Sequence, residues 1–147
     1  EMLIISSEVG QSKIHGLGVF TKEDVKKGAV IWVSHKDFDL YYTEEQLNRL
    51  PEVPRTNMYD HCYKNNKTGK FVLCGDEARY MNHSDEYNVV SQHFSSEEEA
   101  RAFGLGDEVD WAEGVSVAAR DIAKGEELTC DYKEFDLDAR RKLGEFY

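Results

Sequence analysis

Residues 79–84 read RYMNHS and residues 125–132 read GEELTCDY, and these two stretches decide the fold of the chain. A third stretch, HGLGVF at residues 15–20, precedes them near the start of the sequence. Each stretch alone is a weak signal, because glycine turns and Asn-His-Ser runs are common in ordinary loops. Three of them in this order and at this spacing form a specific pattern.

In residues, order and spacing, the three stretches resemble the motif blocks of the SET domain, a family of protein-lysine methyltransferases that use S-adenosylmethionine. The resemblance spans residues 12–135, which is nearly the whole chain. It implies a mainly β fold with short helices, the β-clip arrangement of several small curled sheets. It also implies a C-terminal pseudoknot, in which the last segment threads beneath a preceding loop. General rules of chain connection would not predict that threading.

Size and composition fit a single domain over residues 1–147, with a helical tail at residues 136–147. A chain of 147 residues, 40% of them hydrophobic, buries roughly two-thirds of its unfolded surface, enough for a core without disulfides. Its longest apolar runs, such as residues 2–5, fall far short of the roughly 20 residues that span a bilayer, so we expect no membrane contact. Because Glu1 precedes Met2, a larger parent protein is left open.

The net charge of −11 bears on the partners of the chain. It argues against direct binding of nucleic acid, which needs a basic surface. It favours a cationic partner drawn by long-range attraction, although solubility explains the charge equally well. Resemblance and charge together indicate a basic, lysine-containing protein or peptide such as a histone. The sequence leaves open whether a homodimer completes the peptide groove.

The three cysteines, Cys62, Cys74 and Cys130, are odd in number and none belongs to a CxxC pair. This pattern predicts free thiols rather than a disulfide framework or a zinc cluster, so we expect no metal. Asp85 stands where the family often has a cysteine, which further weakens a zinc role nearby. Free thiols indicate a reducing compartment, and we expect an intracellular protein, cytoplasmic or nuclear.

Hydrophobic patterns and turn residues predict many short strands joined by tight turns. A threonine N-cap followed by acidic residues predicts a helix at residues 43–50, which Pro51 and Pro54 should stop. The strands are expected at residues 2–6, 17–20, 29–33, 88–94 and 115–119, with a hairpin formed by residues 59–63 and 71–74 and a helical turn at residues 95–100.

The chemistry implied by the resemblance sets modest demands on side chains. Methyl transfer from a sulfonium to an amine is an in-line displacement, so the protein must hold both reactants in register and dry. The attacking lysine must be neutral, yet its ordinary pKa is about 10.4. Burial and the charge of the sulfonium both lower that pKa. No acid–base pair is strictly required, and none stands out in the sequence.

Two tyrosines are the catalytic candidates that the resemblance supplies. Tyr132 ends the last motif block, and in the family this hydroxyl points towards the methyl group and the lysine nitrogen, where it orients the amine. Tyr63 is similar to a family tyrosine that lines the channel for cofactor and lysine, and Tyr59 is its rival. A core tyrosine at the end of a strand is the alternative for Tyr132.

The resemblance also implies that S-adenosylmethionine, and its product S-adenosylhomocysteine, lie against all three blocks. Main-chain groups of Asn82 and His83 would bind the adenine, while the asparagine side chain fixes the bend of the chain. Glycines in the first block would let the backbone approach the methionine part closely, although a plain turn is the default. The expected cofactor-binding residues are His15, Gly16, Leu17, Gly18, Tyr63, Arg79, Asn82, His83, Tyr132 and Phe135.

Trp32, Tyr80 and Cys130 are expected to line the channel for the target lysine. Many family members have Phe or Tyr in place of Cys130, so we expect room beside the amine for higher methylation states. A nucleophilic role for this cysteine would need an activating base, and none is evident. Trp32 and Phe135 also fit the core, and residues 146–147 are expected to help close the site.

Two functions without turnover stay open. One is a SET-fold module that binds S-adenosylmethionine or a peptide as a sensor or reader, and the other is a structural β-clip domain with no cofactor. The presence of Tyr132 argues against the first, and that of Asn82 and His83 argues against the second. Cys130 and Asp85 depart from the family pattern and keep the first alternative open.

Overall fold

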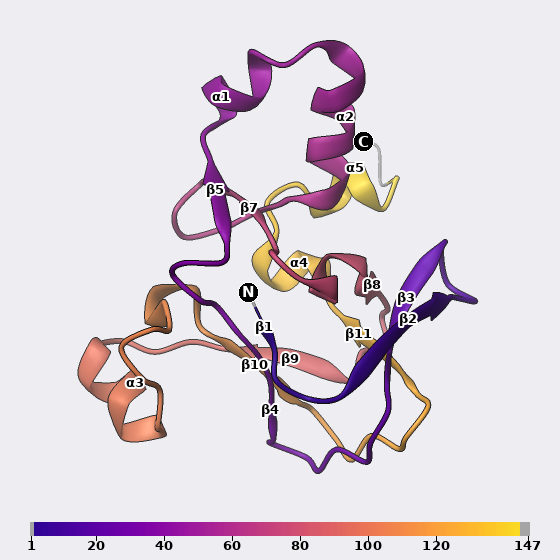
Figure 1. Cartoon of the computed structure of the whole chain (residues 1–147), viewed down its shortest axis with the longest axis vertical. Helices are drawn as coiled ribbons and strands as arrows, with labels where there is room; N and C mark the ends of the chain where they lie inside the picture. The colour runs from indigo at the N-terminus through magenta and orange to yellow at the C-terminus, as the bar shows by residue number, and fades with distance from the viewer. Residues whose placement is uncertain (1, 145–147) are drawn as a thin grey trace.

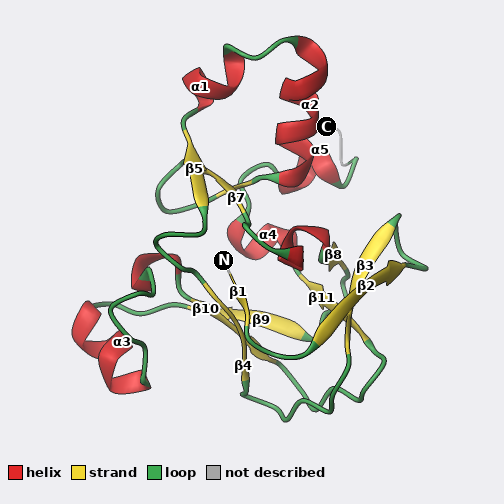
Figure 2. Cartoon of the chain, in the orientation of Figure 1, coloured by secondary structure: helices red, strands yellow, loops and turns green. Residues whose placement is uncertain are grey.

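Short strands arranged in two sheets form the framework of the chain in the computed structural model, which describes residues 2–144 (Figure 1; Figure 2). The mainly β fold with short helices is therefore confirmed. The described helices include none long and apolar enough to cross a membrane. The strands are β1 (Met2–Leu3), β2 (Ser7–Gln11), β3 (Leu17–Thr21), β4 (Val30–Val33), β5 (Leu40–Tyr42), β6 (Tyr63–Lys64), β7 (Phe71–Leu73), β8 (Asn82–His83), β9 (Val89–Gln92), β10 (Val115–Ala118) and β11 (Glu127–Cys130). The helices are α1 (Glu44–Asn48), α2 (Glu52–His61), α3 (Glu97–Phe103), α4 (Tyr132–Phe135) and α5 (Ala139–Lys142), with 3-10 helices η1 (Glu77–Tyr80) and η2 (Trp111–Glu113).

The strands form two sheets. The larger sheet has the order β1-β4-β10-β9-β11-β3-β2, with β8 paired beside β11. Its pairs are antiparallel, except that β11 runs parallel to β8 and β9. The smaller sheet, β5-β7-β6, lies with α1 and α2 in the upper half of Figure 1. Helix α4 lies between the two sheets in that view, where segments distant in sequence meet.

Two similar turns pair with each other through an isolated bridge outside the named strands. Residues 24–28 read DVKKG and residues 121–125 read DIAKG. Val25 and Ile122 form an antiparallel bridge, with a main-chain N–H to O distance of 2.8 Å in both directions. The aspartate that opens each turn accepts a hydrogen bond from a main-chain N–H of the other. The glycine that ends each turn has positive φ, which glycine adopts without strain.

The largest hydrophobic cluster anchors two of the three motif blocks. Val19 of the first block and Leu128 of the third are fully buried beside Ile31 of β4. Full burial of an aliphatic side chain of this size contributes about 1.5–3 kcal/mol. The motif blocks are thus held by core side chains, which leaves their polar neighbours free to build contacts at the strand ends.

The structure corrects the prediction for residues 52–63. Helix α1 ends at Asn48, two residues before the expected end at residue 50. Pro51 is the N-cap of α2, and Pro54 lies in the first turn of α2. Proline is tolerated there, because the N–H groups of a first turn have no partner within the helix. The strand predicted at residues 59–63 is therefore wrong, since residues 59–61 are helical.

Other elements differ less from expectation. Strand β2 was not predicted, because SEVGQ lacks a hydrophobic alternation, yet it pairs with β3 along its whole length. The hairpin forms between β6 and β7, with Gly69 at positive φ in its loop. Of the helical tail expected at residues 136–147, the described residues 136–144 form only the short α5. The closing role expected for residues 146–147 falls outside the described residues.

The segment after β11 lies between two earlier parts of the chain. On one side, the main-chain N–H of Tyr132 donates to His83 in β8. On the other side, the N–H of Asn66 donates to the carbonyl oxygen of Phe135 at 3.0 Å, next to the β6–β7 hairpin. This enclosure is the arrangement that a C-terminal pseudoknot requires, and it places α4 against both sheets (Figure 1).

Candidate active site

A pocket lies where the two sheets and the C-terminal segment meet. Its walls come from β4, β9, β10 and β11 of the larger sheet, from β6 of the smaller sheet, and from the ends of α2, α4 and α5. The predicted site residues that line it are Trp32, Tyr63, Arg79, Cys130, Tyr132 and Phe135. Lining residues that sequence reasoning did not single out include Asn65, Glu113, Asp136 and Lys142.

Tyr132 is fixed at the first position of α4 by two hydrogen bonds. Its main-chain N–H donates to Nδ1 of His83 at 3.1 Å, and its hydroxyl donates to the carbonyl oxygen of Met81 at 2.6 Å. Burial is the main reason that the pKa of this hydroxyl lies well above its ordinary value of 10. The phenol therefore stays protonated at neutral pH and presents a neutral, oriented hydroxyl to the pocket.

Tyr63 connects the aromatic wall of the pocket to a buried carboxylate. Its hydroxyl donates to Oε2 of Glu113 at 3.0 Å. Its ring meets that of Phe135 edge-on with a centroid distance of 5.2 Å, and Phe135 lies 6.2 Å from Tyr132 in the same manner. The rival, Tyr59, packs in the core of the smaller sheet and is not a lining residue. The geometry thus favours Tyr63 over Tyr59 as the site tyrosine.

The side chain of Asn82 joins all three motif blocks. Its Nδ2 donates to the main-chain carbonyls of His15 at 3.1 Å and Leu17 at 2.9 Å, and to Oε1 of Glu127 at 2.9 Å. An amide nitrogen has two hydrogens, so the three contacts share them. These contacts agree with a side chain that fixes the path of the backbone. The adenine contacts expected of Asn82 and His83 stay a prediction.

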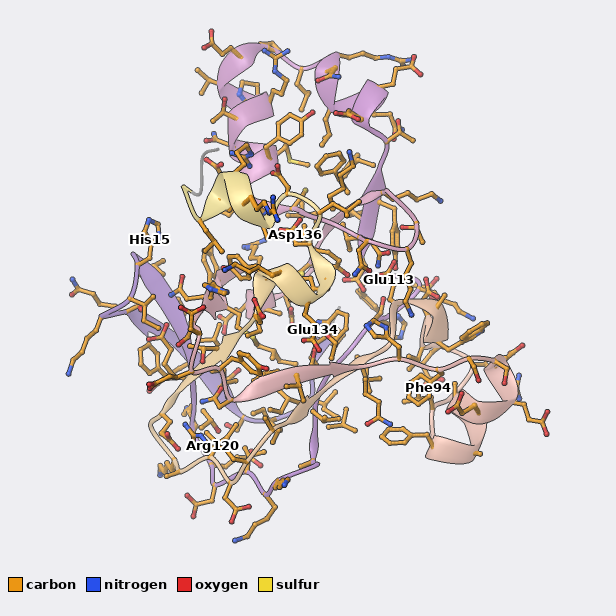
Figure 3. The ribbon with its side chains drawn as sticks, turned by 180° about the vertical axis from the view of Figure 1, so that it is seen from behind. His15, Phe94, Glu113, Arg120, Glu134 and Asp136 are labelled. Carbon is orange, nitrogen blue, oxygen red and sulfur yellow. The ribbon has the colours of Figure 1, made fainter. Side chains whose placement is uncertain are left out.

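The first motif block lies outside the pocket lining. Residues 12–16 join β2 to β3, so residues 15–18 cover the end of this loop and the start of β3. Figure 3 shows His15 at the far end of that hairpin from Glu113. A Cβ at Gly18 would lie 2.2 Å from Oε1 of Glu127, so the missing side chain is what lets this carboxylate approach. Gly18 therefore has a structural role, and the cofactor contact predicted for this block stays a prediction.

Each ring nitrogen of His83 has a neighbouring group that orients the ring. Because Nδ1 accepts the hydrogen bond from Tyr132, the neutral imidazole carries its proton on Nε2. That Nε2 lies 3.4 Å from a carboxylate oxygen of Asp85, the residue that departs from the family cysteine. The ring of His83, a residue of β8, is thus held against the start of α4. Its centroid lies 5.5 Å from the centroid of the Tyr132 ring.

The three predicted channel residues are separated by the structure. Trp32 and Cys130 line the pocket and are almost fully buried. Within residues 2–144, the indole Nε1 of Trp32 is a buried donor with no hydrogen-bond partner. Tyr80 is not a lining residue: its ring lies under the guanidinium of Arg79 at 5.1 Å and edge-on to His61.

A buried ion pair closes one side of the pocket. Nζ of Lys142 lies 2.6 Å from Oδ2 of Asp136, and these side chains are 13% and 1% exposed. The same ammonium donates to the carbonyl of Cys62 and lies 5.9 Å from the ring centre of Tyr132. Sequence reasoning gave Lys142 no role beyond a helical tail, because helical spacing does not reveal which distant carbonyl a lysine will meet.

Glu113 is the site residue that sequence reasoning missed. It ends η2, whose N-cap Asp110 accepts a hydrogen bond from the main-chain N–H of Ala112, and only 7% of Glu113 is exposed. Gly114 follows at positive φ, and a Cβ there would lie 2.5 Å from the carbonyl oxygen of Gln92. The glycine after the glutamate was the available signal, since it lets the chain turn back tightly against β9.

Metal-binding groups do not gather in the described part of the chain. Over residues 2–144, no three His, Cys, Asp or Glu side chains are grouped so that they could hold an ion. The three cysteines are buried, line the pocket and are not joined in disulfides. Burial raises the pKa of Cys62 to about 11, so this thiol is protonated and unreactive at neutral pH.

The fold and the motif geometry define a class of protein. The SET domain family model matches residues 16–133, which is most of the chain. The chain therefore belongs to the SET domain family.

Curated relatives support this membership. The chain is 26% identical over 130 residues to "Histone-lysine N-methyltransferase 2D" of Homo sapiens, across 88% of this chain and 2% of that protein. It is 27% identical to "Histone-lysine N-methyltransferase trr" of Drosophila melanogaster, across 88% of this chain and 5% of that protein. It is 30% identical to "Histone-lysine N-methyltransferase ATX2" of Arabidopsis thaliana, across 89% of this chain and 11% of that protein. The chain thus spans a small part of each relative.

A solved structure shares the fold. The crystal structure of a candidate histone methyltransferase from Plasmodium falciparum superposes with a TM-score of 0.58 at 22% identity. The match covers 87% of this chain and 93% of that chain. At this identity the likeness establishes the fold alone, and the activity has to be argued from the site.

Proposed function

We propose that this chain transfers a methyl group from S-adenosylmethionine to the ε-amine of a lysine in a basic protein. The observation that carries the proposal is the hydroxyl of Tyr132, which is held by Met81 within an aromatic pocket where the second and third motif blocks meet. Membership of the SET domain family supports it, and so do relatives named as histone-lysine N-methyltransferases.

The pocket offers groups that fit S-adenosylmethionine. Its sulfonium is a cation, and the rings of Tyr63, Tyr132 and Phe135 can attract a cation. The guanidinium of Arg79 can bind a carboxylate, and the unpaired Nε1–H of Trp32 can donate to a ligand oxygen or nitrogen. An unsatisfied buried donor costs stability, so a ligand that accepts from it is favoured.

Each candidate site residue has a defined task in the proposed reaction. When bound, S-adenosylmethionine supplies the electrophilic methyl group. The hydroxyl of Tyr132 would orient the amine nitrogen by a hydrogen bond, and Tyr63 would hold the opposite side of the amine. The aromatic and aliphatic walls exclude water, which lowers the pKa of the bound amine and favours its neutral form. The resident side chains thus position reactants and need no acid–base pair.

The proposed substrate is a basic, lysine-containing protein or peptide, with a histone as the leading candidate. The net charge of −11 would attract it over long range, and the same charge disfavours nucleic acid as a direct partner. A histone substrate would place the protein in a nucleus, whereas another basic protein is compatible with the cytoplasm. A homodimer that completes the peptide groove is compatible with this proposal.

The small side chain of Cys130 should set the number of methyl groups added. It lines the pocket where a larger aromatic side chain would fill space beside the amine. We therefore expect dimethylated or trimethylated product from the preferred substrate, and Cys130→Tyr should shift the product towards monomethyl-lysine. Mass spectrometry of the product measures this directly, and monomethyl product alone from the unaltered protein would contradict the expectation.

Transfer of radiolabelled methyl tests the proposed function. Wild type and Tyr132→Phe would be incubated with labelled S-adenosylmethionine, mixed histones and a panel of basic proteins, with cofactor binding measured separately. We expect transfer by wild type and a loss of at least about a hundredfold in the variant, the scale for removing one oriented hydrogen-bonding group. Cofactor binding without transfer by wild type would instead indicate the sensor or reader function.

A further inference from the structure

We propose that the carboxylate of Glu113 binds the ammonium group of the lysine side chain as it enters the pocket. This proposal rests on the proposed function, because it assigns a residue to the substrate of that same site. It adds a recognition group for the charged amine to the tyrosines that the motif pattern supplied.

The hydrogen bonds of Glu113 leave one oxygen open. Oε2 accepts from the hydroxyl of Tyr63 at 3.0 Å and from Nδ2 of Asn65 at 2.5 Å. The other oxygen, Oε1, makes no hydrogen bond to any residue in the described range 2–144. Because Glu113 lines the pocket and is 93% buried, its open oxygen is available to a group that enters there.

The charges around the pocket single out the same residue. Three acidic residues line it, and two of them have cationic partners: Asp136 pairs with Lys142 at 2.6 Å, and Asp60 pairs with Arg141 at 3.1 Å. Glu113 forms no ion pair within the described part of the chain. Figure 3 shows Glu113 and Asp136 near each other beside α4, so the paired and unpaired acids share one site.

A buried carboxylate without a cation is costly unless something completes it. Burial raises the pKa of Glu113. The hydrogen bonds from Tyr63 and Asn65, and the charge of Lys67, which forms no ion pair with it among the described residues, offset that effect only in part. An alkylammonium supplies both the missing charge and N–H donors for the open oxygen. The sulfonium of the cofactor supplies charge but has no N–H, so the lysine ammonium is the better match.

The contact concerns entry of the substrate rather than the attack itself. A carboxylate stabilises the charged form of an adjacent amine, whereas the attacking amine must be neutral. Glu113 would therefore draw the charged lysine into the pocket and align it with Tyr63. The same interaction would discriminate against uncharged side chains of similar length, which makes Glu113 a specificity-determining residue.

Small-molecule binding tests this assignment without any need for turnover. The probes are n-butylammonium, which mimics the end of a lysine side chain, the neutral 1-butanol, and trimethylsulfonium, a cation without N–H groups. Binding is followed at pH 8 by the indole N–H signals of the two tryptophans in nitrogen-15-labelled protein. Trp32 lines this pocket, and Trp111 lies outside it and serves as an internal reference.

We expect wild type to bind n-butylammonium more tightly than 1-butanol, with a shift at Trp32 and none at Trp111. Glu113→Gln should weaken n-butylammonium binding about tenfold, the scale for a hydrogen bond to a charged group, and leave 1-butanol unchanged. The glutamine carbonyl can still accept both bonds made to Oε2, so the variant removes charge and little else. Glu98→Gln, an exposed acid on α3, is the matched control and should bind all three probes as wild type does.

Three outcomes would overturn the proposal. The first is equal binding of n-butylammonium and 1-butanol by wild type, which needs no variant and so holds even if Glu113→Gln fails to fold. The second is unchanged n-butylammonium binding in a folded Glu113→Gln. The third is an equal loss of trimethylsulfonium binding in Glu113→Gln, which would assign the carboxylate to the sulfonium of the cofactor. A protein that passes these tests yet transfers no methyl group would contradict the proposed function alone.

Discussion

Glu127 and Glu113 each lie beside an asparagine, but the two carboxylates are completed in different ways. Glu127 receives hydrogen bonds on both oxygens, from the hydroxyl of Ser12 and from Nδ2 of Asn82. Glu113 receives both of its bonds on one oxygen, from Tyr63 and Asn65. The first group ties motif blocks together, and the second faces a pocket. The comparison teaches that polar groups completed within the chain hold the fold, whereas incomplete ones mark where a ligand belongs.

The largest loss of stability is expected when the contacts around the Glu127 carboxylate are removed. Asn82→Ala removes the donor that joins His15, Leu17 and Glu127, and it leaves these partly buried acceptors unsatisfied. Each such loss costs about 1–3 kcal/mol, so we expect about 3 kcal/mol less free energy of unfolding. Urea denaturation measures it. A loss below about 1 kcal/mol would show that water replaces the contacts and would weaken the comparison.

An intermediate loss of stability is expected at Asn65, which both holds the fold and contacts the pocket carboxylate of Glu113. The carbonyl oxygen of the Asn65 side chain caps its own turn by accepting from the N–H groups of Lys67 and Thr68, while Nδ2 serves Glu113. Asn65→Asp keeps the cap and sets a second carboxylate against Glu113. We expect a loss of about 2 kcal/mol at pH 7 that shrinks towards pH 4, because protonation of one acid relieves the repulsion.

Unfolding at the two pH values checks the Asn65→Asp variant. Asn65→Ser keeps a capping oxygen without adding charge and is the control, so its loss should shrink less towards pH 4 than that of Asn65→Asp. A pH-independent loss in Asn65→Asp would mean that Glu113 is already neutral at pH 7.

The smallest effect is expected at an unpaired donor. Nε1 of Trp32 has no partner in the described residues, so Trp32→Phe gives up no hydrogen bond. The remaining cost is the smaller ring, and we expect a loss of about 1 kcal/mol in unfolding free energy. Thermal unfolding checks this value. A much larger loss would indicate that the indole N–H already has a partner in solution, such as an ordered water.

The sequence predicted the framework of this fold better than its pocket. The strands around Val19 and Ile31 followed from local hydrophobic patterns, and the order of the motif blocks indicated the β-clip. The failure at residues 52–63 arose because Pro51 and Pro54 were read as helix breakers, although a first turn tolerates both. Strand β2 was missed because its pairing with β3, rather than its own pattern, makes it a strand.

In the candidate site, the motif pattern located the residues that belong to a motif block. Tyr132 and Cys130 lie in one block, and both line the pocket. Glu113 and Lys142 have no motif around them, and their place depends on contacts with Tyr63 and Asp136 made only after folding. Tyr80 shows the opposite error, since a residue inside a motif block packs away from the pocket lining.

One matched substitution at both carboxylates separates the two roles most directly. Burial raises the pKa of Glu113 in the folded chain, where Tyr63, Asn65, Asp110 and Lys67 act on it. The folded state therefore binds a proton more readily than the unfolded chain does, so the cost of the buried charge is present at neutral pH and vanishes below about pH 4. Replacement of that charge by a neutral amide removes this cost.

The measurement is the unfolding free energy of Glu127→Gln and Glu113→Gln against wild type at pH 7. We predict opposite signs: Glu127→Gln should lose about 1 kcal/mol, because it weakens charge-assisted bonds within the chain, and Glu113→Gln should gain about 1 kcal/mol. At pH 4 the gain of Glu113→Gln should disappear. A loss of similar size in both variants would contradict the account, because Glu113 would then hold the fold as Glu127 does.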